Sequence, residues 1–243
     1  MKIIAHRGAS GEYPENTLLA LDQAINQAAD GIELDVQYHQ SGQFILLHDA
    51  DLETSTNGKG HFSQLTLAQL QQLDAGQGQQ IPTLQQALQQ INGRCLVNIE
   101  LKLISTDNQE MLKIILALHK MLSQAVTEQH FTWQQFIISS FNHPLLAEIK
   151  LLVPKLTTAA LTASCPLNYA AFAQELKTFS INPAINMLTP NLVKDAHQRG
   201  LQVWAYTVDK KSDIQYCYDL AIDGIFTNYP AKSRHYLKQL CAS

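Results

Sequence analysis

The sequence has few cysteines, no long apolar run and no secretory signal. Among its 243 residues only four are cysteines, namely Cys95, Cys165, Cys217 and Cys241. They are too scattered for the close pairs typical of zinc sites or redox motifs, so we expect free buried thiols. No segment approaches the roughly 18 unbroken apolar residues of a membrane-spanning helix, and the first residues lack the apolar stretch and cleavage site of a signal peptide. We therefore expect a cytoplasmic protein with no membrane anchor.

The chain also lacks an excess of basic residues. Lys and Arg number 17 against 21 Asp and Glu, which gives a net charge of -4. Proteins that bind the nucleic-acid backbone carry basic faces, so we expect no nucleic-acid partner. A hydrophobic share of 46% excludes a disordered or fibrous protein. A chain of this length buries a core large enough to fold without disulfides or a metal.

Short apolar runs alternate with amphipathic stretches along nearly the whole chain. Runs typical of strands occur at residues 3–5, 31–36, 44–47, 96–101 and 136–138, near residues 158 and 179, and at residues 201–206 and 224–227. Apolar residues at helical spacing lie between most of them. This alternation predicts parallel strands joined by helices, and about eight such units in about 250 residues are typical of a (β/α)₈ TIM barrel. No G-x-G-x-x-G follows the first strand, which disfavours a doubly wound sheet.

One segment departs from this alternation. Between about residues 50 and 82 the chain has turn-forming residues, a weak helical pattern at residues 67–73 and a stretch rich in Gly and Gln. Such a segment is typical of an insertion on a loop. We therefore predict a single TIM-barrel catalytic domain over residues 1–243 that includes a 50–82 insertion.

Carboxylates alternate with apolar residues on two of the predicted strands. Residues two apart share a face of a strand, so Glu33 and Asp35 point together into the barrel, as do Asn98, Glu100 and Lys102. Burying carboxylates without a partner costs several kcal/mol each. An all-oxygen set of this kind suits Mg²⁺ or Ca²⁺ rather than zinc. A network of salt bridges through Lys102 is the alternative, and the pattern on both strands favours the metal.

Two histidines stand at the ends of predicted strands, where TIM barrels carry their active sites. His6 follows the first strand and His48 the third. A single histidine at such a position is usually structural, but two can act as acid and base on opposite sides of a reacting group. Arg7 and Lys102 offer charges for a phosphate. The combination indicates chemistry at a P–O bond, with Asp49 orienting His48 or, less favoured, contacting the metal.

These motifs, in this order, resemble those of the glycerophosphodiester phosphodiesterases. The resemblance rests on His6-Arg7-Gly8, Pro14-Glu15-Asn16-Thr17, Glu33-x-Asp35, His48-Asp49, Glu100-x-Lys102, the Trp204 segment and the closing Asp223-to-Pro230 segment. It implies a (β/α)₈ barrel that hydrolyses glycerophosphodiesters, such as glycerophosphocholine or glycerophosphoethanolamine, to sn-glycerol 3-phosphate and an alcohol.

The resemblance also implies a role for each motif residue. Glu33, Asp35 and Glu100 would hold a divalent cation, Mg²⁺ or Ca²⁺. His6 and His48 would be the acid/base pair, while Arg7 and Lys102 would bind the phosphate of a small-molecule substrate. The nucleophile would be water or the substrate's own glycerol hydroxyl.

Three further residues have two interpretations each. Phe141 and Trp204 resemble apolar walls near the glycerol or alcohol group, and plain packing inside the barrel explains them equally well. Asn16 either stabilises the start of the first helix or touches the substrate.

Other functions on the same barrel are disfavoured. A lysophospholipase D or a sphingomyelinase-type phosphodiesterase would need an exposed apolar lip, and the insertion offers only a modest apolar set. Secreted relatives of that kind would also carry a signal peptide and disulfides. A non-catalytic module that binds phosphate or metal would be expected to have lost a histidine or carboxylate, and none is lost. A metal-independent structural barrel is disfavoured as well, and thermal stability that EDTA and Mg²⁺ leave unchanged would favour it.

Overall fold

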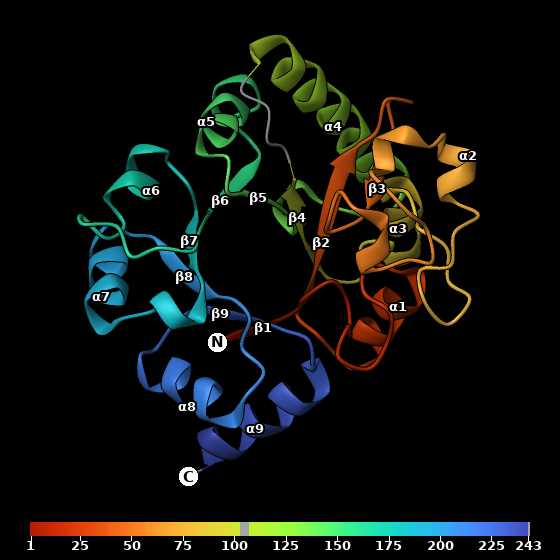
Figure 1. Cartoon of the computed structure of the whole chain (residues 1–243). Helices are drawn as coiled ribbons and strands as arrows, with labels where there is room; N and C mark the ends of the chain where they lie inside the picture. The colour runs from red at the N-terminus through yellow and green to blue at the C-terminus, as the bar shows by residue number, and fades with distance from the viewer. Residues whose placement is uncertain (103–106, 243) are drawn as a thin grey trace.

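Residues 1–102 and 107–242 are described by a computed structural model, in which a ring of strands is surrounded by helices (Figure 1). Within these residues, eight parallel strands form the ring: β1 (Lys2–Ala5), β2 (Gly31–Tyr38), β4 (Leu96–Leu101), β5 (Phe136–Ser140), β6 (Thr157–Thr162), β7 (Ser180–Pro183), β8 (Gln202–Ala205) and β9 (Gly224–Thr227). The ring closes because β1 pairs with both β2 and β9. The predicted (β/α)₈ barrel is confirmed.

Helices follow most of these strands and cover the outside of the barrel (Figure 1). They are α1 (Leu18–Asn26), α3 (Leu84–Ile91), α4 (Asn108–Glu128), α5 (His143–Leu152), α6 (Ala171–Glu175), α7 (Pro190–Gln198), α8 (Lys211–Asp219) and α9 (Pro230–Ala242). The sequence explains several of their starts. The side chain of Thr17 accepts a hydrogen bond from the N–H of Ala20 at the start of α1, and Thr189 caps α7 with Pro190 in its first turn.

Alternation along the strands separates two environments. The apolar residues of β2 and β4, such as Leu34 and Ile99, pack against the helices in the outer core. The intervening residues point into the barrel. Near its N-terminal end the interior is filled by an apolar layer that comprises Ile4, Ile137, Ala159, Trp204 and Phe226. The polar residues of β2 and β4 lie above this layer, toward the mouth.

The third strand of the sequence differs from the expectation for a barrel strand. β3 (Phe44–Leu46) is antiparallel to β2, with Val36 opposite Leu46 and Tyr38 opposite Phe44. β2 has eight residues and extends past its neighbour, so a hairpin leads the chain back toward the barrel. β3 therefore pairs with the end of β2 at the rim and is not one of the eight strands of the barrel.

The segment after β3 has a small core of its own. It contains the 3₁₀ turns η1 (Leu52–Thr54) and η2 (Phe62–Gln64) and the short helix α2 (Leu67–Leu70). Leu52, Phe62 and Leu70 pack together with Ile45 and Ile81. Ile45 belongs to this cluster while Phe44 and Leu46 belong to the outer core, so β3 joins the two. Figure 1 shows β3 and α2 at one side, next to β2 and α3.

Two further 3₁₀ turns, η3 (Trp133–Gln135) and η4 (Ile185–Met187), lie in loops of the barrel. Across the described ranges, no helix has both the length and the apolar character needed to cross a membrane.

Trp204 tests the packing inside the barrel. Its side chain is 1% exposed, and the rings of Phe179 and Phe226 lie 6.0 Å from its own. Because truncation leaves a large cavity, Trp204→Ala should lower the free energy of unfolding by about 3–5 kcal/mol in a urea titration. Leu167→Ala, at a side chain that is 95% exposed, is the control and should change little. A weaker substrate affinity at unchanged stability would contradict this packing role.

Candidate active site

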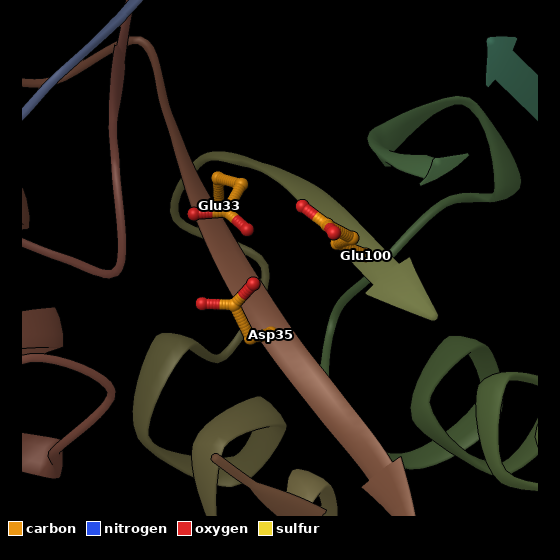
Figure 2. A group of neighbouring side chains, drawn as sticks. All are labelled: Glu33, Asp35 and Glu100. Carbon is orange, nitrogen blue, oxygen red and sulfur yellow. The ribbon is translucent and has the colours of Figure 1, made fainter. Parts of the chain in front are cut away.

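Three buried carboxylates meet at the mouth of the barrel. Glu33 and Asp35 project from β2, and Glu100 projects from the neighbouring strand β4 (Figure 2). The register pairs Asp35 with Glu100, and one oxygen of each of the three carboxylates lies within 4.8 Å of the others. The alternation in the sequence correctly predicted that these side chains share the inner face.

Burial and mutual repulsion perturb the titration of this cluster. Burial, followed by the charges of Asp35 and Glu100, raises the pKa of Glu33 well above its usual range. The pKa of Glu100 is also raised, first by burial and then by Asp35. Asp35 is the exception. Burial opposes its ionisation, but Lys102 and Arg7 together lower its pKa.

Arg7 and Lys102 lie among the carboxylates. Lys102 Nζ is 2.6 Å from Glu100 and 3.0 Å from Asp35. Arg7 Nε is 3.0 Å from Asp35 Oδ2, and its Nη1 donates to Glu15 at 2.9 Å. The salt bridges through Lys102, which the sequence offered as the alternative to a metal, are therefore present. These two cations face four carboxylates, however, so the group keeps an excess of negative charge.

The excess charge fits a metal ion. Oε2 of Glu33 accepts a hydrogen bond from the N–H of Arg7, whereas its buried Oε1 has no hydrogen-bond partner among the described residues. A buried oxygen without a partner is costly, and a divalent cation would satisfy it. The donors are all carboxylate oxygens, which suit Mg²⁺ or Ca²⁺. Glu33, Asp35 and Glu100 therefore fit the group that the sequence predicted.

A tight turn after β1 places Arg7 and His6. Arg7 has a φ of 57° and Gly8 a φ of 80°, so both lie in the left-handed region. A Cβ on Gly8 would come within 2.6 Å of the carbonyl carbon of Ala20, which explains the glycine. The turn directs the N–H of Arg7 at Glu33. It therefore connects the predicted phosphate-binding residue directly to the cluster of three carboxylates.

Asn16 holds Asp35 in place. Its side-chain amide donates to Asp35 Oδ2 at 2.9 Å, and its Oδ1 accepts from the N–H of Asp35 at 3.1 Å. Thr17 rather than Asn16 caps α1. The sequence alone gave two other interpretations of Asn16, because a bond between residues 19 positions apart has no local signal.

The β2–β3 hairpin places His48 beside the cluster. The N–H of Leu47 donates to the backbone carbonyl of Asp35 at 3.1 Å. The chain therefore leaves β3 beside Asp35, one residue before His48. His48 Nδ1 lies 2.9 Å from Asp49 Oδ1, the contact of an orienting residue. The sequence associated His48 with a strand end of the barrel, whereas the hairpin brings it to the mouth from the rim.

His6 lies at the end of β1, which pairs with β2 on one side and with β9 on the other. Its Nδ1 is 2.8 Å from Oδ1 of Asn228, which follows β9. Burial, with a smaller contribution from Arg7, lowers the pKa of His6 to about 4. Both histidines are close enough to Asp35 to lower its pKa. Asn228 belongs to a motif in the sequence, but its contact with His6 spans 222 positions and was not anticipated.

The two candidate wall residues occupy different depths. Phe141 is 48% exposed and lines a cleft of about 340 Å³ together with His48, Glu100 and Lys102. Its ring meets that of Tyr206 edge-on at 6.0 Å. Trp204 lies two residues earlier on β8, in the apolar layer below. The structure brings Phe141 to the site and keeps Trp204 in the core.

Known proteins resemble this chain in sequence and in fold. The sequence model of the glycerophosphoryl diester phosphodiesterase family matches residues 6–232. A glycerophosphodiester phosphodiesterase from Caldanaerobacter subterraneus subsp. tengcongensis is 34% identical over 236 residues and 94% of each chain. One from Bacillus subtilis is 33% identical over 93% of this chain and 83% of its own.

A solved structure agrees with these relatives. The phosphodiesterase of Oleispira antarctica in complex with the product sn-glycerol-3-phosphate superposes with a TM-score of 0.88 at 29% identity, over 98% of this chain and 97% of the other. The chain therefore belongs to the glycerophosphoryl diester phosphodiesterase family and is an enzyme with that activity.

Proposed function

We propose that the enzyme hydrolyses soluble glycerophosphodiesters, such as glycerophosphocholine and glycerophosphoethanolamine, to sn-glycerol 3-phosphate and an alcohol. The reaction would use a divalent cation, Mg²⁺ or Ca²⁺, and the histidine pair. The observation that carries the proposal is the cluster of three buried carboxylates within 4.8 Å of one another, with His6 and His48 both close enough to Asp35 to lower its pKa.

The cation and the basic side chains share the phosphate in this proposal. Glu33, Asp35 and Glu100 would hold the cation, which supplies Lewis-acid stabilisation of the negative charge that develops on phosphoryl oxygens. Arg7 and Lys102 already contact Asp35, and they offer donors to the phosphate from the same side. Such donors are effective because they are fixed before the charge develops.

The partners of the two histidines suggest a division of labour. His6 has a lowered pKa of about 4, so its ring is neutral at pH 7 and can accept a proton from the attacking hydroxyl, whether of water or of the substrate's glycerol group. His48 Nδ1 lies 2.9 Å from Asp49 Oδ1, a contact that orients its ring. His48 would donate its proton to the departing alkoxide. In each step one P–O bond forms as another breaks, and one proton moves at each end. Attack by water gives glycerol 3-phosphate directly, whereas attack by the glycerol hydroxyl gives a cyclic phosphate that water opens in a second such step.

Phe141 and Tyr206 would line the organic part of the substrate. Phe141 is half-exposed in the cleft, and the hydroxyl of Tyr206 is held by the carbonyl of Thr162 at 3.0 Å. Two fixed rings offer an apolar wall next to the phosphate-binding residues. Trp204 would support this wall from the layer below.

A direct assay of product tests the proposal. Release of glycerol 3-phosphate from glycerophosphocholine and glycerophosphoethanolamine should occur with Mg²⁺ or Ca²⁺ and stop with EDTA. His6→Ala should abolish release. His235→Ala is the control, because His235 is exposed on the last helix α9, and it should not affect release. Release that persists in EDTA would contradict the requirement for a divalent cation, and release by His6→Ala would contradict the catalytic role of His6.

Glu33→Gln tests the proposed metal site by a binding measurement that does not depend on enzyme activity. The substitution keeps an acceptor for the N–H of Arg7 but removes the charge, so we expect Mg²⁺ affinity in calorimetry to fall by more than about 100-fold, the upper range for merely supporting residues. Glu128→Gln, at the exposed end of α4, is the matched control. An unchanged affinity would exclude Glu33 as a ligand.

The raised pKa of Glu33 also predicts a pH effect in the metal-free protein. A group whose folded pKa lies above its unfolded value stabilises the fold at low pH, and this contribution is lost as pH rises through the folded pKa. Metal-free wild type should therefore lose stability as pH rises above the usual range of a glutamate carboxyl, and Glu33→Gln should lose less. Thermal unfolding of both proteins in EDTA measures this, and parallel curves would contradict it.

His48→Ala separates catalysis from metal binding. Since His48 contacts Asp49 and none of the three clustered carboxylates, its loss should leave Mg²⁺ affinity within about threefold while lowering kcat by about 100-fold or more, the range for a general acid. Calorimetry and the product assay measure the two quantities. Loss of the metal in this variant would show that His48 is itself a ligand.

A further inference from the structure

We propose that Asn228, clamped by Asp209, is a positioning residue that fixes the ring orientation and the tautomer of His6. The inference rests on the proposed function in one respect, which is that His6 acts through its Nε2. Neither Asn228 nor Asp209 contacts the carboxylate cluster, so the role is distinct from metal binding.

Asn228 makes two contacts with Asp209 and one with His6, and these contacts determine which way its side-chain amide faces. Its Nδ2 donates to Asp209 Oδ2 at 2.7 Å, its backbone N–H donates to Asp209 Oδ1 at 2.8 Å, and its Oδ1 lies 2.8 Å from His6 Nδ1. A carboxylate only accepts hydrogen bonds. The NH₂ group of Asn228 must therefore face Asp209, and its carbonyl oxygen must face His6.

The orientation of this amide determines the state of the His6 ring. A carbonyl oxygen only accepts, so the atom that faces it, Nδ1 of His6, must carry the proton. In the neutral ring the other nitrogen, Nε2, then has the free lone pair. This is the form that accepts a proton from a hydroxyl. If the Asn228 amide turned over, Nδ1 would become the acceptor and Nε2 the donor, which is the wrong tautomer for a base.

The surroundings hold this arrangement from several elements. The backbone N–H of His6 donates to the carbonyl of Thr227 at 2.9 Å, so β1 and β9 are in fixed register where the two side chains meet. The hydroxyl of Thr227 donates to Asp209 Oδ1 at 3.0 Å. Ser10 Oγ lies 2.8 Å from Asn228 Oδ1. Asp209 itself follows β8, where the N–H of Val208 bonds to Phe226.

The charges that face His6 define what a change at residue 228 would do. Arg7, next to it in the chain, disfavours the protonated ring, whereas Asp35 on β2 and Asp209 after β8 favour it. Asn228 is its neutral neighbour at hydrogen-bond distance. A carboxylate in place of this amide would still accept from Nδ1, and it would also favour the protonated ring.

Exchanging the two side chains tests the proposal. In Asp209→Asn a second NH₂ group faces that of Asn228, so the amide can turn over; we expect kcat to fall at least about 10-fold, as for outer-sphere partners of reactive histidines, with KM and Mg²⁺ affinity nearly unchanged. In the double variant Asp209→Asn/Asn228→Asp, the new amide donates to the new carboxylate, and the carboxylate accepts from His6. Most of kcat should return.

The pH profile gives a readout that a merely structural role would not change. In the double variant a carboxylate stabilises the protonated ring of His6, so the acidic limb of kcat/KM should move to higher pH than in wild type. Asp219→Asn, at an exposed carboxylate that accepts from Gln215 on α8, is the matched control and should change neither kcat nor the limb. Single-variant rates equal to those of this control would overturn the proposal.

Nitrogen-15 NMR of the wild-type protein with Mg²⁺ reads the tautomer without any substitution. At pH 7 the Nδ1 of His6 should be protonated and Nε2 unprotonated, with the signal assigned by its loss in His6→Ala. A neutral ring protonated at Nε2 would overturn the proposal. If His6→Ala retains activity, the proposed role of His6 fails. If His6→Ala is inactive while Asp209→Asn matches wild type, only the role of Asn228 fails.

Discussion

An excess of buried negative charge at the mouth of the barrel is the constraint on which the site depends. Glu33, Asp35 and Glu100 share a small volume with little access to water, and such a cluster is unstable unless positive charge lies beside it. Arg7 and Lys102 supply two charges from the ends of β1 and β4. The unpartnered oxygen and the raised pKa of Glu33 indicate that these two are insufficient, and the divalent cation that we propose would complete the balance.

The geometry of β2 accounts for much of the rest. This strand has eight residues, so its first five supply two carboxylates to the barrel while Val36–Tyr38 pair with β3. The hairpin then returns His48 to the level of Asp35. The core of the 50–82 segment packs on the opposite face of β3 from the outer core, and thereby supports the loop that carries His48.

Closure of the barrel serves the second histidine in a similar way. β1 and β9 are neighbours only because the sheet closes on itself, and His6 meets Asn228 at that seam. The two histidines thus have different partners, a neutral amide for His6 and the carboxylate of Asp49 for His48. This difference in partners is consistent with the separate roles of base and acid that we propose for His6 and His48.

The sequence by itself determined the fold class and which three carboxylates share the inner face of the barrel. Period-two alternation on residues 31–36 and 96–101 placed three carboxylates on one inner face, because strand geometry is local. Tertiary structure decided the remainder. The reversal of β3, the bond of Asn16 to Asp35, the seam contact of Asn228 and the depth of Trp204 all depend on which distant segments become neighbours. Hydrophobic periodicity states which face of an element is buried, but it does not state against what, and contacts between residues 19 or 222 positions apart exist only after the barrel has closed.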